Sequence, residues 1–104
     1  MPADNDFPNL TLEGGRLTAR REMSFHGREL ELACRELFKV DEPELVIDLS
    51  RLDYVASPQI GALTAACARA VQQGRVLRVL VSPVLEKFLG RMKIDGLIDY
   101  EVVD

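Results

Sequence analysis

This chain of 104 residues has few of the residue types that build metal centres and nucleophilic sites. Its one histidine is His26, and its two cysteines, Cys34 and Cys67, show no CxxC spacing. A metal centre or a catalytic triad needs clustered partners that the spacing does not supply, and a disulfide framework needs more cysteines. We therefore expect His26 to be structural or exposed, and both cysteines to be inert thiols on inner helix faces.

Long apolar runs are also missing, which excludes a membrane span. The first six residues are acidic where a secretory signal would be basic, so we expect a cytoplasmic protein without direct membrane insertion. A formal charge of −4 argues against nucleic acid as a partner. The one basic stretch, Arg16 to Arg21, alternates with apolar residues and is typical of a solvated strand face.

The composition is that of an ordinary globular protein, with 47% apolar and 29% charged residues. This length supports one core and hardly two, so residues 1–104 are predicted to form a single domain. No glycine-rich phosphate loop, paired carboxylates or nucleophile-base arrangement emerges from the spacing, and we expect neither an enzyme nor a cofactor. Asp48 and Asp53 are the nearest approach to an acid/base pair, but carboxylates at such positions usually form turns or caps.

The first half of the chain predicts a hairpin followed by a helix. Residues 9–22 alternate apolar and polar side chains around Gly14-Gly15, a pair that can adopt the positive φ angles of tight hairpins. Apolar residues then recur at helical spacing within residues 27–39, at Leu30, Ala33, Cys34, Leu37 and Phe38. Asp41-Glu42-Pro43 ends this helix.

The second half alternates strands and helices. Strands are predicted over residues 44–49, 76–81 and 100–103, and a long helix from Pro58 to Gln73 that ends at Gly74. The inward stripe of this helix is expected to contain Ile60, Leu63, Cys67, Ala70 and Val71. Ser82-Pro83 begins a third helix in the same way as Ser57-Pro58 begins the second.

This order predicts an α/β fold with a mixed sheet of about five strands and about three helices. Right-handed crossovers between parallel strands, together with the antiparallel hairpin, account for the mixed sheet. Three helices are too few to cover both faces, so we expect them mainly on one face. The open face is then available to a partner or to a second copy of the chain.

The segment from Leu45 to Leu63 carries the strongest functional signal. An apolar strand ends in Asp48-Leu49-Ser50, a polar and aromatic crossing follows, and Ser57-Pro58 leads into a helix. We expect Ser57 to be the N-cap and Pro58 the first helical residue. The positive end of the helix dipole could receive a phosphate or an acidic group, although Ser57 could equally be a simple cap.

This order of elements and motifs resembles the sulfate transporter and anti-sigma factor antagonist (STAS) domain family, over nearly the whole chain. The matching motifs are Asp48-Leu49-Ser50, the crossing at residues 52–55, the helix start at residues 56–61, and the third helix with its exit at residues 94–97. The resemblance implies a STAS-like fold. It also implies docking onto a partner through the junction between the strand and the helix.

The resemblance also implies a phosphorylation switch, from which this sequence departs. The position phosphorylated by a partner serine kinase in the family's anti-sigma antagonists aligns with Pro58, which has no hydroxyl. Two acidic positions of the family align with Ala56 and Met23. The usual switch is therefore predicted to be absent, and phosphorylation of the neighbouring Ser57 is a secondary possibility.

The function implied is a non-enzymatic regulator that binds an anti-sigma factor or a serine kinase-like protein through residues 53–63. An alternative is an accessory or scaffold subunit of a lipid-transport or stress-sensing complex, and a homodimer is possible. Leu52, Val55, Ile60 and Leu63 could also belong simply to the core. The residues expected to contact the partner are Asp53, Tyr54, Ser57, Pro58, Gln59 and Ile60.

Overall fold

In a computed structural model of the protein, residues 9–20, 28–92 and 98–103 are described. The predictions for Met23, His26 and residues 94–97 lie outside these residues. The predicted order of helices and strands is confirmed, with the following bounds: β1 (Leu10–Glu13), β2 (Arg16–Ala19), α1 (Glu29–Leu37), β3 (Glu44–Leu49), α2 (Ser57–Gln73), β4 (Val76–Val81), α3 (Pro83–Arg91) and β5 (Tyr100–Val102).

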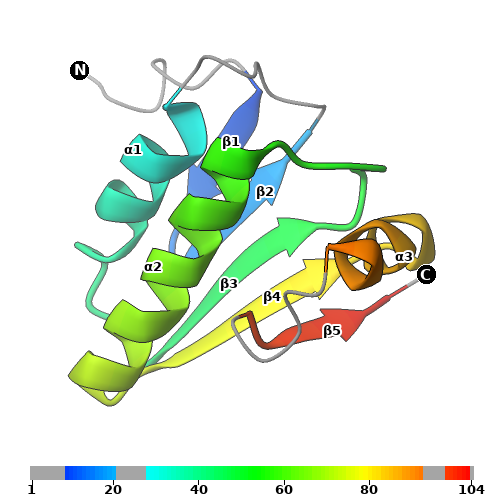
Figure 1. Ribbon diagram of the computed structural model, residues 1–104. Helices are drawn as coiled ribbons and strands as arrows, with labels where there is room; N and C mark the ends of the chain where they lie inside the picture. Colours follow the sequence, from blue (N-terminus) through cyan, green and yellow to red (C-terminus); the bar gives the residue numbers. More distant parts are fainter. Residues whose placement is uncertain (1–8, 21–27, 93–97, 104) are drawn as a thin grey trace.

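The five strands form one mixed sheet in the order β1-β2-β3-β4-β5. The β1–β2 pair is antiparallel and the other three pairs are parallel. Successive crossovers move in one direction along the sheet, and right-handed crossovers then place their helices on one face. Figure 1 shows α1 and α2 side by side across that face, with α3 near the carboxyl ends of β3 and β4. The α/β class and the mixed sheet are therefore as predicted.

The β1–β2 hairpin turns at the predicted glycine pair, and the two glycines have different structural roles. Gly14 has a φ of 59°, the left-handed conformation that a tight turn needs. Gly15 lies against β3, where an added Cβ would be 3.2 Å from the carbonyl oxygen of Glu44. Its own carbonyl accepts a hydrogen bond of 2.8 Å from the N–H of Val46. Gly15 therefore allows β2 and the hairpin turn to lie close against β3.

The core lies between the helices and the sheet face that they cover. On β3 the buried residues alternate, at Leu45, Ile47 and Leu49, and β4 adds Val79 and Val81. Each fully buried aliphatic side chain of this kind contributes about 1.5–3 kcal/mol to folding. The helices complete the same core cluster with Leu30, Ala33, Leu37, Leu63, Ala66, Ala70, Leu85 and Leu89.

The inward face of α2 differs from the predicted stripe by about one residue. Its buried residues are Gln59, Leu63, Ala66 and Ala70, whereas Val71 is 80% exposed. Apolar and small residues surround α2 on every side, so their spacing does not fix which stripe meets the sheet. The end of the helix is as predicted, since Gly74 adopts a left-handed φ of 67° and caps the last turn.

The opposite face of the sheet carries ion pairs between neighbouring strands. Arg16 of β2 pairs with Asp48 of β3. Arg78 of β4 lies 2.9 Å from Glu101 of β5 and 3.4 Å from Glu44 of β3. Such half-exposed pairs contribute little free energy, but they make this face compatible with water. The prediction of a solvated strand face is confirmed for Arg16.

Arg75, just after α2, fixes the connection between α1 and β3. Its guanidinium donates to the carbonyl oxygens of Phe38, Val40 and Glu42. The last carbonyls of a helix have no partner within the helix, so a positive charge there is favourable. The same guanidinium lies 5.6 Å from the centroid of the Phe38 ring. Arg75 thus holds Phe38 in place at the end of α1.

Candidate functional site

The junction between β3 and α2 begins with a turn organised by Asp48. This carboxylate accepts hydrogen bonds from the backbone N–H of Ser50 at 2.9 Å and from its hydroxyl at 2.6 Å. Partial burial raises the pKa of Asp48, but the hydrogen bonds from Ser50 and Arg16 outweigh it and hold that pKa below its usual range. Asp48 therefore acts as a turn-forming carboxylate.

The crossing after this turn is anchored by two buried residues and exposes two others. Leu52 and Val55 are buried in the core, whereas Asp53 and Tyr54 face solvent. The backbone N–H of Leu52 bonds to the carbonyl of Leu49 at 3.0 Å. The two buried residues at the ends of the crossing therefore hold Asp53 and Tyr54 at the surface.

The start of α2 corrects two predictions. The N-cap is Ala56, so Ser57 is the first helical residue and Pro58 the second. The predicted capping role of Ser57 is wrong, and so is the predicted start at Pro58. Gln59 is 3% exposed, and its side-chain oxygen accepts from the backbone N–H of Ala56 at 2.7 Å. This is one half of a capping box, in which the third helical residue reaches back to the N-cap.

Because Gln59 is buried, its side chain is not at the surface that a partner would contact. Its carbonyl oxygen fixes the backbone beneath the site, so the prediction that it contacts a partner directly is wrong. Ile60 is partly buried against the core. Ser57 and Pro58 remain exposed, and Gly61 is exposed one turn further along the same face. The residues exposed at the junction are therefore Asp53, Tyr54, Ser57, Pro58 and Gly61. We call these five residues the junction surface.

Residues of α3 extend this surface, and the sequence did not point to them as contacts. The ring of Tyr54, which is 41% exposed, meets the ring of Phe88 edge to face with centroids 6.4 Å apart. Val84 lies one helical turn before Phe88 and is 55% exposed. The repeated Ser-Pro step was the available signal, because it places a second helix start at the carboxyl edge of the sheet.

The start of α3 has the geometry that was predicted for α2. Ser82 is the N-cap, and its hydroxyl oxygen accepts from the N–H of Leu85 at 3.0 Å. The same hydroxyl donates to the carbonyl of Leu52 at 3.0 Å. Ser82 therefore ties α3 to the crossing that carries Tyr54.

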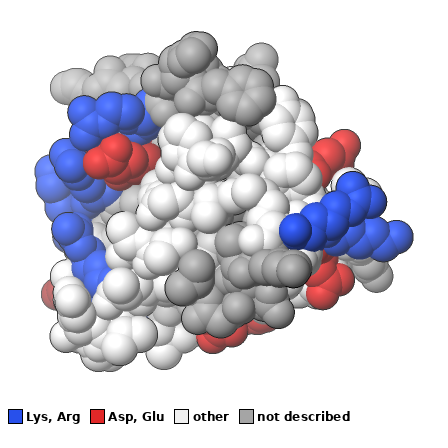
Figure 2. Space-filling view, viewed as in Figure 1, with Lys and Arg blue, Asp and Glu red and all other residues white. Residues whose placement is uncertain are grey.

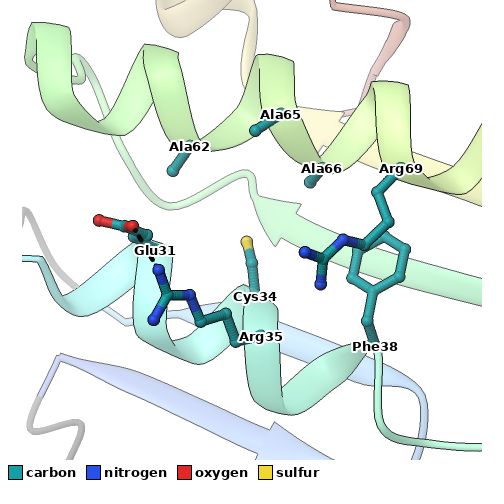
Figure 3. Close-up of a pocket in the computed structure, with 8 residues that line it drawn as sticks. All are labelled: Glu31, Cys34, Arg35, Phe38, Ala62, Ala65, Ala66 and Arg69. Atoms are coloured by element: carbon teal, nitrogen blue, oxygen red, sulfur yellow. Dashed lines mark hydrogen bonds and ion pairs between the residues drawn. The ribbon is translucent and has the colours of Figure 1, made fainter.

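A groove lies between α1 and α2, and it was not predicted from the sequence. This groove has a volume of about 220 Å³. Each helix contributes four residues at spacings of three, four and seven, which place them on one helix face. The lining residues, drawn in Figure 3, are Glu31, Cys34, Arg35 and Phe38 of α1 with Ala62, Ala65, Ala66 and Arg69 of α2.

The cysteines are free thiols, as predicted. Burial raises the pKa of Cys34 to about 12, and burial also raises the pKa of Cys67. A thiol with a raised pKa carries little thiolate at neutral pH and is a poor nucleophile. Cys34 therefore contributes an apolar wall to the groove.

Across residues 9–20, 28–92 and 98–103, no group of three His, Cys, Asp or Glu side chains is arranged to hold a metal ion. In the same part of the chain, no helix has both the length and the hydropathy to cross a membrane. No protein-family model, curated protein or solved structure matches this chain.

Proposed function

We propose that this chain is a non-enzymatic, STAS-type protein-interaction regulator that binds its partner through the junction surface. The partner class is an anti-sigma factor or a related serine kinase-like protein, and the expected location is the cytoplasm. One observation carries the proposal: Ser57, Pro58 and Gly61 form an exposed, uncharged start of α2 beside the half-exposed ring of Tyr54. Aromatic and uncharged groups of this kind are favoured at the centre of protein interfaces.

Charge supports the choice of this surface. Residues 54–68 contain no charged side chain, so the first turns of α2 present the positive end of the helix dipole without an acidic residue in the first turn. A partner can cover residues 54–61 without desolvating a charge, and Asp53 is the one charged member of the junction surface. Binding is then constitutive, or controlled by the supply of the partner, because Pro58 carries no hydroxyl.

The sharpest test uses a glycine substitution with a matched control. Gly61→Arg adds a long charged side chain to the junction surface, and a Cβ at this position meets no atom within 4 Å. Gly90→Arg in α3 is the control, because Gly90 is also exposed and also has no atom within 4 Å of an added Cβ. Both variants are expected to fold, since replacing a helical glycine raises helix propensity.

The measurement has two steps. Tagged wild-type protein is purified from its native host, and the co-purified partner is identified by mass spectrometry and then titrated by calorimetry. Gly61→Arg is expected to weaken binding at least about tenfold, a loss of about 1.4 kcal/mol, while Gly90→Arg leaves it unchanged. Equal affinity of Gly61→Arg and wild type would show that the junction surface is not the binding site.

Phosphorylation of Ser57 is tested separately by intact-mass analysis of the native protein. Ser57 is exposed and is not the N-cap of α2, so modification would not remove a cap. A phosphate would add roughly −1.5 to −2 charges at the positive end of the helix dipole. Our proposal of constitutive binding predicts no modification under any growth condition, and a phosphate on Ser57 would replace it with switched binding.

The alternative function is an accessory subunit of a lipid-transport or stress-sensing complex. The exposed apolar side chains of Tyr54 and Val84 favour it, because permanent interfaces are more apolar than transient ones. The same purification distinguishes the two functions. A kinase-fold or sigma-related partner favours the regulator, whereas co-purification with transporter subunits in a complex of high native mass favours the accessory subunit.

A further inference from the structure

The groove between α1 and α2 combines an apolar floor with arginines at its rim. Figure 3 shows the Cys34 sulfur and the methyl groups of Ala62 and Ala66 facing the space between the helices. Cys34 and Ala66 are buried, and Ala65 is exposed above them. Small side chains on α2 therefore leave room for another chain to approach both helices.

The rim carries positive charge that the described residues of the chain do not neutralise. Arg69 lies 5.6 Å from the centroid of the Phe38 ring. Among the residues that the structure describes, Arg69 has no carboxylate partner. Stacking on Phe38 holds its guanidinium beside the groove, where it is available to a carboxylate of another molecule.

The acidic group at the other end of the groove is already engaged. Glu31 accepts from Arg28 at 3.0 and 3.2 Å and from Arg35 at 3.1 Å. Among the lining residues, Arg35 and Arg69 against the one carboxylate of Glu31 leave a formal charge of +1 in a chain whose net charge is −4. Figure 2 shows blue side chains with a red group among them on the α1 side of the molecule, beside a broad uncharged centre.

We propose that this groove binds an acidic amphipathic helix of a protein partner. The lining of each helix spans eight residues, a length of about 10 Å or two helical turns. A third helix can lie between two neighbours with its small apolar residues against the alanines and a carboxylate on Arg69. The volume is below the roughly 300–1,000 Å³ of small-molecule sites, so the groove accepts side chains in preference to a cofactor.

The proposal is independent of the junction surface and needs its own probe. A displayed library of peptides of about 14 residues, four helical turns, carries Ala or Leu on one face and varies the flanking positions between Glu, Lys and Gln. The complete chain is the bait, and enriched peptides are then titrated individually by fluorescence polarisation. We expect enriched peptides to carry Glu next to the apolar face, and their Glu-to-Lys counterparts to lose binding.

Two substitutions locate the binding site. Arg69→Glu reverses the charge at the rim and is expected to weaken binding at least tenfold, and Arg69→Gln is expected to give a smaller loss with the same side-chain bulk. Arg91→Glu, an equal reversal at an exposed arginine of α3, is expected to have no effect. Tyr54→Ser, a change on the junction surface beside α3, is also expected to have no effect, which separates failure here from failure of the junction surface.

Three results would overturn the proposal. The first is a selection that enriches no acidic peptide. The second is a set of binders that Arg69→Gln and Arg69→Glu leave unaffected while both variants retain the wild-type thermal transition. The third is an equal loss of binding in Arg69→Glu and in the Arg91→Glu control, because the effect would then come from overall charge and not from the rim of the groove.

Discussion

The two helices that follow β3 and β4 both begin with Ser-Pro, yet the dipeptide occupies different positions in them. In α3, Ser82 is the N-cap and Pro83 the first helical residue. In α2 the pair is displaced by one position, so Ala56 is the N-cap and Ser57 lies within the helix. In α2 the buried side chain of Gln59 accepts from the N–H of the N-cap Ala56, which is the reciprocal half of a capping box and involves no serine.

The displacement changes what each serine can do. The Ser82 hydroxyl accepts from Leu85 and donates to Leu52, so it is committed to the fold. Ser57 is exposed on the first turn of α2, with Pro58 beside it. One dipeptide therefore serves as a structural cap at one helix and as presented surface at the other.

The largest expected effect comes from breaking the support under α2. Gln59→Met keeps the side-chain volume but removes the acceptor for the Ala56 N–H. Leaving a buried donor unpaired is expected to lower the free energy of unfolding by about 2 kcal/mol, measured by urea denaturation. Gln72→Met is the control, because Gln72 is exposed on the same helix, and it should change stability by less than about 0.5 kcal/mol.

A second prediction concerns the strand ends that lead to the two helices. β4 passes directly into Ser82, whereas β3 needs the turn held by Asp48. Asp48→Asn should lower the free energy of unfolding by about 1.5 kcal/mol at pH 7, because hydrogen bonds to a charged group are lost. Because Arg16 is half-exposed, solvent screens its ion pair with Asp48, and the expected loss in the free energy of unfolding is therefore small for a hydrogen bond to a charged group.

The sign of the pH dependence follows from the lowered pKa of Asp48. A carboxylate with a lowered pKa in the folded state stabilises the protein above its usual pKa of about 3.9, and that contribution disappears as the pH falls through the lowered value. Urea titrations of wild type and Asp48→Asn should therefore converge as the pH falls through the lowered pKa of Asp48. A difference that persists undiminished in acid would show that the carboxylate charge is not responsible.

The smallest expected effect tests the two serines against each other. Ser82→Ala removes a cap and should cost about 1 kcal/mol. Ser57→Ala removes no cap and should change stability by less than about 0.5 kcal/mol. Thermal denaturation of both variants measures the contrast, and equal losses would contradict the assignment of Ala56 as the N-cap.

The sequence was sufficient for the elements and their order, because apolar periodicity differs between strands and helices and glycine marks both the hairpin and the end of α2. The same periodicity failed to orient α2, since apolar or small residues occur on every side of this helix. Val71 was therefore expected inside and lies outside. A helix face of small residues is oriented by its packing, which the sequence does not report.

The sequence predicted which segment carries the candidate site, but not which of its residues are exposed or which other helices contact them. Asp53, Tyr54, Ser57 and Pro58 are exposed at the junction, in the segment that the sequence indicated. Gln59 was predicted to be exposed because a polar residue near a helix start usually is, whereas its side chain turns inward and accepts from the backbone N–H of Ala56. The contact of Tyr54 with α3 and the groove beside α1 depend on tertiary packing between residues distant in sequence.

Arg78 has a consequence for the behaviour of the protein at high concentration. Its guanidinium pairs with carboxylates from both adjacent strands on the uncovered side of the sheet. Val46 lies opposite Arg78 on β3, and Leu80 lies two residues further along β4. Arg78→Val would join these positions into an apolar strip, and because such strips promote self-association we expect this variant to aggregate more readily than the wild type.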